Sequence, residues 1–484
     1  QAAREMVAAR RPKAVASFPD RLLNLFFLRP IIVRLLKKQV AARARKEHYP
    51  APYAIIDLWA RHGASRRTGY RAEARSFADL MVTSTSRNLV RVFFLQNRLK
   101  SQGSKSATNI SRVHVVGAGV MGGDIAAWCA LRGLQVTLQD RGQEYIDPAL
   151  KRAAKMFSKR IHDANDRAAA TDRLVTDIDG DGVAEADLII EAIFEDLDAK
   201  RSLYENLQSA MKEGAILATN TSSLRLEDLR SGLDQPQRFI GLHFFNPVAK
   251  LPLVEVIRCD DTDQGALDTG FAFVKAIGKF PLECMSSPGF VVNRVLGPYM
   301  AEAMYLAEQA VPLAAIDKAA EDFGMPMGPV ELLDSVGIDV ALHVSRVLGS
   351  AFRREVPAVL EEMVKNGNLG RKSGRGFYEW QDGKAVKPEN GQSDLPVDVG
   401  DRLILPMLNE AVACLHEGVV SDADLLDAGV IFGTGFAPFR GGPLHYARNR
   451  GVAEIRATLE RLADRHGDRF RPHEGWAAIE TNVD

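Results

Sequence analysis

The chain has 484 residues, 46% of them hydrophobic and 26% charged, and its 62 basic residues balance its 62 acidic residues. This composition is typical of a soluble globular protein long enough for about three domains. The four cysteines stand far apart without a CxxC pair and no secretory signal is recognisable, which excludes a disulfide framework and a zinc site and favours a reducing compartment.

The N-terminal region is strongly basic. Residues 1–110 contain 22 basic and 6 acidic residues, so their net charge of +16 is balanced by −16 in the rest of the chain. Helical patterning and the polar stretch SQGSKSATN predict a basic helical linker region over residues 1–109. It either meets an acidic membrane surface or a phosphorylated substrate, or is a solvated arm that complements the acidic remainder. No nucleic-acid partner is expected, because the region has no recognisable binding motif.

The stretch LLNLFFLRPIIVRLLKK within this region allows two interpretations. Arg29, Pro30 and Arg34 interrupt its apolar run, which excludes a helix that spans a membrane. One alternative is an interfacial amphipathic helix that makes peripheral membrane contact. We favour the other, a helix buried against a neighbouring domain.

A new domain begins near residue 110 with a strand, a glycine-rich turn, a helix and a second strand, in the segments RVHVV, GAGVMGGDIAAWCALRG and QVTLQD. In this setting Gly117 permits a tight turn, Gly119 lets the backbone approach a pyrophosphate, and Gly122 permits close packing. Asp140 at the end of the second strand favours the ribose hydroxyls of NAD over the 2′-phosphate of NADP. Arg141 leaves NADP open as the alternative.

Strand and helix patterns go on alternating in DLIIEAIFE, DAKRSLYENLQSAM, AILATNTSS and RFIGLHFF. This alternation predicts a largely parallel sheet covered by helices. We therefore expect a Rossmann-type NAD-binding domain over residues 110–288, with its ligand cleft between the carboxyl ends of the strands and the helices that follow. Beyond Pro288 no strands are predicted.

The sequence pattern of the helical remainder of the chain indicates an internal repeat. NRVLGPYMAEAMYLAEQAV from Asn293 is similar to DRLILPMLNEAVACLHEGVV from Asp401, and a Phe-Gly pair follows each at a similar offset. Chance similarity of two amphipathic helices is the alternative, but the shared positions favour a duplication. The fold class is thus α/β followed by two related all-α domains, residues 289–390 and 391–484.

The stretch GLHFFNPVAKLPLVEVI places His243 between apolar runs and Glu255 twelve residues later. Oxidising an alcohol with NAD needs a base for the hydroxyl proton, and histidine titrates near neutrality. Glu255, on a neighbouring strand after a turn at Asn246 and Pro247, would stabilise the imidazolium. By residue type alone, a hydrogen-bonded histidine of the core is as good an interpretation as a base.

Several segments in order and spacing resemble one known family. GAGVMGG, IIEAIFEDLDAK, NTSSL, GLHFFNPV, VEVI, PGFVVNR and GRKSGRGFY, between about residues 110 and 380, are similar to the L-3-hydroxyacyl-CoA dehydrogenase family. The form that the chain most resembles is the dehydrogenase half of the multifunctional fatty-acid β-oxidation enzyme. The duplicated tail supports this form, because single-function members usually finish near GRKSGRGFY.

The resemblance implies roles for particular residues. His243 is the base that removes the 3-hydroxyl proton, and Glu255 is its electrostatic partner. Ser222 hydrogen-bonds near the reacting oxygen, and Asn293 positions the substrate; the ordinary alternative for either residue is a turn or helix cap. The dinucleotide site is implied to contain Gly117, Gly119, Met121, Gly122, Asp140, Ile193, Phe194, Glu195, Lys200, Ser222 and Asn246.

Two of the implied positions have plain alternatives. Glu195 and Lys200 would equally form a surface ion pair. The segment FRGGPLHYARNRG is similar to one whose tyrosine touches substrate, which places Tyr446 there, but a half-buried tyrosine that packs one helical unit on the other is as good an interpretation.

The resemblance also implies a reaction and partners. We expect reversible NAD-dependent oxidation of L-3-hydroxyacyl-CoA to 3-ketoacyl-CoA, with no metal. The parent protein is expected to be bifunctional and partnered with a thiolase in a homo- or hetero-oligomer, but hydratase activity is not expected here, because the chain begins too late to hold that half. The location is cytoplasmic if bacterial, mitochondrial or peroxisomal if eukaryotic. The alternatives are another NAD-dependent hydroxyacid dehydrogenase and a non-catalytic NAD-binding assembly module.

Overall fold

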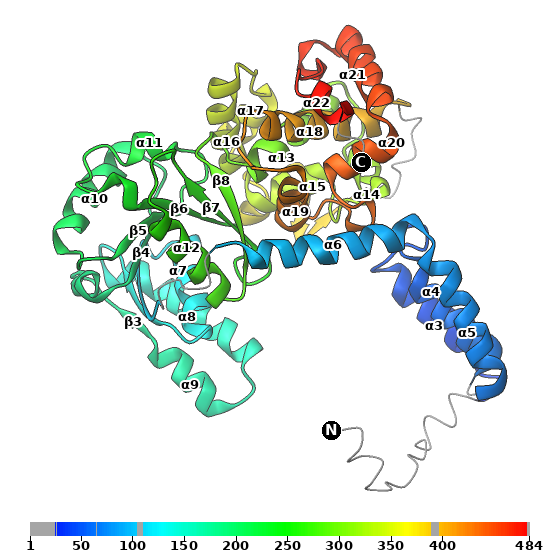
Figure 1. Ribbon diagram of the computed structural model, residues 1–484, viewed down its shortest axis with the longest axis horizontal. Coiled ribbons are helices and arrows are strands. Elements are labelled where there is room, and N and C mark those ends of the chain that lie inside the picture. Colours follow the sequence, from blue (N-terminus) through cyan, green and yellow to red (C-terminus); the bar gives the residue numbers. More distant parts are fainter. Residues whose placement is uncertain (1–24, 26, 64, 104–109, 389–395, 482–484) are drawn as a thin grey trace, which may run out of the picture. The chain divides into compact units, whose positions relative to one another are not determined.

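A computed structural model describes residue 25 and residues 27–63, 65–103, 110–388 and 396–481 (Figure 1). The chain divides into two compact units, Gln1–Val90 and Arg91–Asp484. Most of the predicted linker stretch SQGSKSATN and the first part of the basic region lie outside the described residues. Among the helices that the described residues form, none combines the length and the apolar character that crossing a membrane requires.

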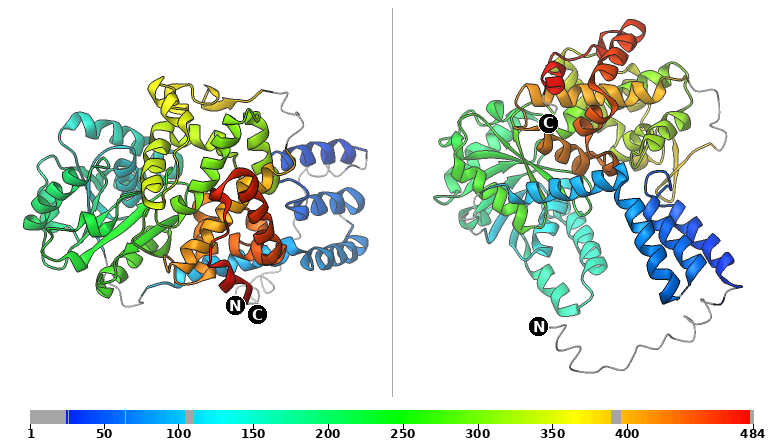
Figure 2. Two further views of the ribbon diagram at one scale, coloured as in Figure 1. Left: turned by 90° about the horizontal axis from the view of Figure 1, so that it is seen from above. Right: turned by 45° about the vertical axis from the view of Figure 1, so that its right-hand side comes forward.

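The first unit is built from helices α3 (Arg29–Ala41), α4 (Pro50–His62) and α5 (Arg66–Met81), which pack in sequence order as adjacent helices (Figure 2). Pro30 lies in the first turn of α3, where its missing N–H leaves no intrahelical bond unmade. The described α3 has no buried residue, and its burial against a neighbouring domain stays a prediction. Among the described helices, α3 packs mainly against α4, and Ile31 of α3 is 61% exposed.

The second unit begins within α6 (Ser84–Ser101) and contains an eight-stranded sheet of order β3-β2-β1-β4-β5-β6-β7-β8 (Figure 1). Its strands are β1 (Arg112–Val116), β2 (Gln135–Gln139), β3 (Leu174–Thr176), β4 (Leu188–Glu191), β5 (Ile216–Thr219), β6 (Phe239–Phe244), β7 (Leu253–Arg258) and β8 (Phe280–Met285). Neighbouring strands are parallel except for β6 and β7. The predicted largely parallel α/β sheet is confirmed, and the ends of β1, β4, β5 and β6 meet at one edge.

Helices connect and cover these strands. They are α7 (Val120–Leu131), α8 (Gln143–Arg160), α9 (Ala164–Asp172), α10 (Leu197–Ala210), α11 (Leu226–Leu229) and α12 (Gln264–Ala276). The apolar face of α7 lies in the same core as the strands, which explains its run of small residues: the buried alanines of DIAAWCAL let the helix approach the sheet closely.

Helices dominate after residue 288. They are α13 (Val292–Glu308), α14 (Leu313–Phe323), α15 (Pro329–Val336), α16 (Ile338–Phe352), α17 (Ala358–Lys365), α18 (Val399–His416), α19 (Ala423–Thr434), α20 (Pro443–Arg450), α21 (Val452–His466) and α22 (Trp476–Thr481). The prediction that strands stop at Pro288 is wrong. Strands β9 (Glu379–Gln381) and β10 (Lys384–Val386) form a hairpin, because Asp382 and Gly383 both have positive φ, which an Asp-Gly turn favours.

The structure supports the duplication of the helical tail. Helices α13 and α18 pack against each other, and each carries an arginine that pairs with a glutamate of the other. Arg294 of α13 lies 2.6 Å from Glu410 of α18, and Arg402 of α18 lies 2.6 Å from Glu302 of α13. The same sequence spacing separates Arg from Glu in both helices. This reciprocal pairing is what two copies of one unit give when they meet face to face.

A second pair of equivalent contacts supports the same conclusion. Asp317 of α14 accepts the backbone N–H of Val330 at the start of α15, and Asp427 of α19 accepts that of Leu444 at the start of α20. In each of the two helical repeats a buried aspartate therefore accepts hydrogen bonds from the free N–H groups at the start of the next helix. The cation beside each aspartate differs between the units, since Lys387 neighbours Asp317 and Arg91 of α6 neighbours Asp427.

Candidate functional site

The glycine-rich turn between β1 and α7 has the geometry of a dinucleotide cradle. Gly117 has φ +101°, and a Cβ atom there would lie 2.7 Å from the carbonyl oxygen of Ala192. A Cβ on Gly122 would lie 1.8 Å from the carbonyl oxygen of Gly117, so both positions require glycine. Gly119 differs, because, apart from its own chain neighbours, no atom of the described residues lies within 4 Å of where its Cβ would be. This open side at the start of α7 fits a pyrophosphate on the helix N-terminus.

Asp140 follows β2 directly and belongs to this cradle. Its carboxylate accepts the backbone N–H of Ala118 at 2.7 Å and that of Arg141 at 2.8 Å, which fixes it beside the glycine turn. The guanidinium of Arg141 lies over the ring of Tyr145, 5.3 Å from its centroid. The arginine therefore has a protein partner, and the carboxylate remains the group that fits a ribose at this strand end.

A buried carboxylate at the end of β4 organises the next part of the site. Glu191 is fully buried and accepts hydrogen bonds from Lys200 (2.6 Å), Tyr204 (2.6 Å) and Thr219 (2.7 Å). Lys200 also lies 3.3 Å from Glu195, so the ion pair of the alternative interpretation forms, but Lys200 is only 1% exposed and the pair lies in the interior rather than at the surface. The site residues predicted from the sequence do not include Glu191. The signal was a carboxylate at the end of the aliphatic run DLIIE, which indicates a buried polar cluster.

Glu195 links this cluster to the loop after β5. Its Oε1 accepts the hydroxyl of Thr221 at 2.5 Å, the backbone N–H of Ser222 at 2.8 Å and the hydroxyl of Ser223 at 3.1 Å. Burial raises the pKa of Glu195, but the Lys200 cation and these hydrogen bonds outweigh it and hold the pKa below its ordinary value. The ionised carboxylate thus fixes the NTSS loop at the carboxyl end of the sheet.

His243 and Glu255 form a buried pair on adjacent antiparallel strands. They lie directly opposite each other in the register of β6 and β7, and Nδ1 of His243 lies 2.6 Å from Oε2 of Glu255. The other oxygen of Glu255 accepts the backbone N–H groups of Val291 (3.0 Å) and Val292 (2.9 Å), where α13 begins. Each carboxylate oxygen therefore has its own partners, and the start of α13 fixes the orientation of the carboxylate.

The environment of the imidazole leaves one nitrogen for chemistry. The ring contacts Phe245 and Phe290, with centroids 4.5 and 5.5 Å away, and the residue is 4% exposed. Within the described residues, hydrogen bonding to this ring is confined to Nδ1. Because Nδ1 faces a carboxylate, it carries the proton, and Nε2 has the free lone pair that a general base needs.

Ser222 and Asn293 approach this pair from two other elements. Nδ2 of Asn293, in the first turn of α13, donates to the carbonyl oxygen of Ser222 at 3.4 Å. The loop after β5 is also tied to β6, because Asn220 accepts the backbone N–H of Phe244 at 2.9 Å. In the described part of the chain no hydrogen bond joins the Ser222 hydroxyl to His243; that hydroxyl faces Glu195 at 3.4 Å. The two residues are brought together, and their roles stay predictions.

Comparison with known proteins decides the family. Residues 112–287 match the NAD-binding domain of 3-hydroxyacyl-CoA dehydrogenases, and residues 289–380 match their C-terminal domain. The chain is 36% identical over 504 residues to the fatty acid oxidation complex subunit alpha of Shewanella baltica, covering 98% of this chain and 71% of that protein. The chain belongs to the 3-hydroxyacyl-CoA dehydrogenase family.

Solved structures agree with this assignment. The 3-hydroxybutyryl-CoA dehydrogenase of Escherichia coli K12 is 28% identical, with a TM-score of 0.68 over 77% of this chain and 98% of that one. The dehydrogenase part of multifunctional enzyme 1 from C. elegans is 26% identical, with a TM-score of 0.59 over 82% and 99% of the two chains. The resemblance, the NAD cofactor and the assignment as a 3-hydroxyacyl-CoA dehydrogenase are therefore confirmed.

The dehydrogenase spans only part of some relatives. The fatty acid oxidation complex subunit alpha of Shewanella loihica is 36% identical in an alignment of 467 positions, which covers 92% of this chain and 66% of the relative.

The remaining residues predicted to contact NAD lie in α7, after β4 and after β6. Met121 is in the first turn of α7, and Ile193 and Phe194 follow β4 beside Ala192. The side chain of Phe194 is 64% exposed, although an apolar ring gains by contact with a ligand. Asn246 is exposed in the loop after β6. Their contacts with NAD stay predictions.

Tyr446 has the environment of the packing alternative. The ring lies on α20 and meets Phe323 of α14 edge-on, with centroids 5.2 Å apart. The guanidinium of Arg440 lies 5.0 Å from its centroid. The tyrosine thus packs the second helical unit on the first, and its contact with substrate stays a prediction.

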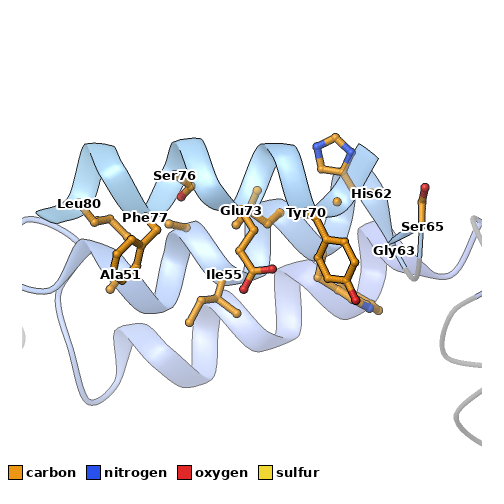
Figure 3. Close-up of a pocket in the computed structure, with 14 residues that line it drawn as sticks. Ala51, Ile55, His62, Gly63, Ser65, Tyr70, Glu73, Ser76, Phe77 and Leu80 are labelled. Carbon is orange, nitrogen blue, oxygen red and sulfur yellow. The ribbon is translucent and has the colours of Figure 1, made fainter. Parts of the chain in front are cut away.

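A hollow of about 550 Å³ in the N-terminal helices lies apart from this chemistry (Figure 3). Its walls come from α4 and α5, with Ile55, Tyr70 and Phe77 among them, and none of the candidate site residues lines it. The first unit buries only Tyr53 and Ile56 among its described apolar side chains. The hollow therefore reflects thin packing between two helices rather than a prepared ligand site.

Proposed function

We propose that His243 is the general base of the dehydrogenase and that Glu255 stabilises the imidazolium that forms. The observation that carries this proposal is the 2.6 Å contact between His243 Nδ1 and a carboxylate whose other oxygen is held by two backbone N–H groups. Such a carboxylate cannot turn away, so it fixes both the ring orientation and the tautomer. Nε2 is then the atom that removes the 3-hydroxyl proton of an L-3-hydroxyacyl-CoA.

Other residues bind the cofactor, orient the substrate and exclude water. When bound in the glycine cradle, NAD supplies the acceptor for the hydride from C3. Ser222 and Asn293, joined at 3.4 Å, orient the reacting oxygen towards Nε2 of His243. Phe245 and Phe290 exclude water from the imidazole. In the reverse direction the imidazolium returns its proton to the oxygen of a 3-ketoacyl-CoA.

Nicotinamide absorbance tests the base directly. Wild type and His243→Ala are mixed with acetoacetyl-CoA and either NADH or NADPH, and NADH affinity is measured by its fluorescence. We expect wild type to consume NADH far faster than NADPH, and His243→Ala to lose turnover by at least a factor of about 10³ while NADH affinity stays within about threefold. The exposed His162→Ala serves as the control and should behave as wild type.

Other outcomes would favour the alternatives. Turnover that survives in His243→Ala would leave the histidine as a hydrogen-bonded residue of the core. NADH binding without turnover of any 3-ketoacyl-CoA would support a non-catalytic assembly module. Turnover of short hydroxy acids without coenzyme A would support another hydroxyacid dehydrogenase.

We also propose the wider context from the named relatives. Relatives named subunit alpha of a fatty acid oxidation complex support an assembly of several subunits. From the family resemblance, we propose that the parent protein is a bifunctional hydratase and dehydrogenase that assembles with a thiolase in the bacterial cytoplasm. The division into a linker region, an NAD-binding domain ending near residue 288 and two helical domains meeting near residue 390 is part of this proposal. Co-purification of the thiolase with the intact protein tests the partner, and its absence at physiological ionic strength would contradict it.

A further inference from the structure

The loop between the two strands of the catalytic pair is held by a buried lysine. Residues 245–252 connect β6, which ends beside His243, to β7, which carries Glu255. Nζ of Lys279, between α12 and β8, donates to the carbonyl oxygens of Val248 at 2.5 Å and Leu251 at 2.6 Å. Lys279 is 4% exposed. The loop therefore closes around an ammonium group rather than around its own side chains.

A second cation and a tryptophan connect the same loop to α7, the helix that starts at the glycine-rich turn. Arg160, at the end of α8, donates to the carbonyl oxygen of Ala249 at 2.6 Å. Nζ of Lys279 and the guanidinium of Arg160 both lie over the ring of Trp128, 4.9 and 5.0 Å from its centroid. Trp128 belongs to α7, and its Nε1 donates to the carbonyl oxygen of Ile277 at 2.9 Å. Three carbonyls of the loop are thus tied to the helix that starts at the glycine cradle.

The burial of this lysine is energetically unfavourable by itself. The titratable groups that act on it are Cys129 of α7 and Arg160 of α8. Burial is the main cause that lowers the pKa of Lys279 to about 8, Arg160 lowers it further, and Cys129 opposes both. A turn in this loop already exists without it, because Lys250 N–H and Leu251 N–H both donate to the carbonyl oxygen of Pro247. The cation is therefore not needed merely to close the turn.

We propose that Lys279 is a positioning residue of the dehydrogenase, which holds the loop so that Asn246 and the end of β6 face the dinucleotide. Asn246 lies two residues before the first carbonyl that Lys279 binds, and three residues after His243. The inference rests on the proposed function in one respect, since it takes Asn246 as a contact of NAD. Lys279 is 4% exposed and acts through the loop whose carbonyl oxygens it binds.

The test measures NADH affinity in a double-mutant cycle of Lys279→Met and Asn246→Ala. We expect Lys279→Met to weaken NADH binding about tenfold, as the loss of two charge-assisted hydrogen bonds implies, and to raise KM for NADH by more than it lowers kcat. Asn246→Ala should weaken binding in the wild-type background but change it less than twofold in the Lys279→Met background. Equal effects of Asn246→Ala in both backgrounds would overturn the proposal.

Two further variants keep the test decisive if Lys279→Met does not fold. Arg160→Met removes one loop contact from an exposed residue and should weaken NADH binding about threefold, with faster hydrogen exchange of the amides of residues 248–251. Unchanged exchange and unchanged affinity would overturn the proposal. Lys275→Met is the matched control, because this lysine of α12 binds the carbonyl oxygen of Gln102 instead, and it should alter neither quantity.

These readouts separate the inference from the proposed function. NADH affinity and hydrogen exchange are measured without turnover, so they test Lys279 even if His243 is not the base. If wild type binds NADH but does not turn over 3-ketoacyl-CoA, the proposed function fails. The double-mutant cycle of NADH affinities still tests the coupling of Lys279 to Asn246.

Discussion

The substitution Glu255→Gln tests the catalytic pair without removing a side chain. In the wild type, Oε1 of Glu255 accepts two backbone N–H groups, from Val291 and Val292, while Oε2 faces His243. A glutamine must turn its carbonyl oxygen to those two N–H groups, because an NH₂ group there would face two donors. Its NH₂ then points at Nδ1 of His243, which has to become the acceptor. The ring proton moves to Nε2, the atom that should accept the substrate proton.

The expected loss follows from this geometry. Removing the carboxylate forfeits a charge-assisted hydrogen bond to the imidazolium, worth about 1.5–3 kcal/mol, or a factor of about 10 to 150 in turnover. The wrong tautomer adds to this, and the equivalent carboxylate-to-amide change in a serine protease triad lowers kcat by about 10⁴. We therefore expect kcat of Glu255→Gln to fall by a factor between about 10² and 10⁴, with NADH affinity nearly unchanged.

The assay follows NADH absorbance at saturating acetoacetyl-CoA, with NADH affinity measured separately. Glu283→Gln is the matched control, since Glu283 lies on the neighbouring strand β8 and pairs at the surface with Arg258 at 2.8 Å. It should retain full turnover, because such an exposed pair contributes little. A kcat of Glu255→Gln within threefold of wild type would refute the reasoning and leave His243 without a charged partner in the mechanism.

Two pairs of substitutions test the cofactor cradle and the duplicated tail. Gly119→Ala should fold normally but weaken NADH binding at least tenfold in a fluorescence titration, because its Cβ meets no neighbour among the described residues and enters the pyrophosphate side. Gly122→Ala should lower Tm, because its Cβ would lie 1.8 Å from a carbonyl oxygen. Arg91→Met should lower the free energy of unfolding, measured by urea denaturation at pH 8, by about 3 kcal/mol, because it leaves the buried carboxylate of Asp427 without its cation. Burial already raises the pKa of Asp427 to about 6, and losing Arg91 raises it further, so the folded state takes up a proton first and the loss should shrink at pH 5.5. Arg98→Met, which removes exposed ion pairs, should cost less than about 1 kcal/mol at both pH values. An NADH affinity unchanged by Gly119→Ala, or a loss in Arg91→Met that does not depend on pH, would contradict these arguments.

Features that depend on local pattern could be predicted from the amino-acid sequence. The β1–α7–β2 unit follows from the spacing of Gly117, Gly119 and Gly122 between two β-branched runs, because turn chemistry and periodicity act over few residues. The pairing of His243 with Glu255 is of the same kind, since a strand, a short loop and a returning strand bring them into register. The equal spacing of Arg and Glu in α13 and α18 is likewise a feature of the amino-acid sequence.

The polar groups that meet in the interior could not be predicted in this way, because the packing of distant segments brings them together. Lys200 is suited to a surface ion pair by its helix position, but Glu191 of β4 draws it into the core. The carboxylate of Glu255 owes its fixed orientation to the start of α13, and the loop after β6 owes its attachment to Lys279 of a later element. These contacts join backbone groups and side chains from distant segments, and backbone N–H and C=O groups are the same at every residue. Their partners carry no periodic signal, so packing alone selects them.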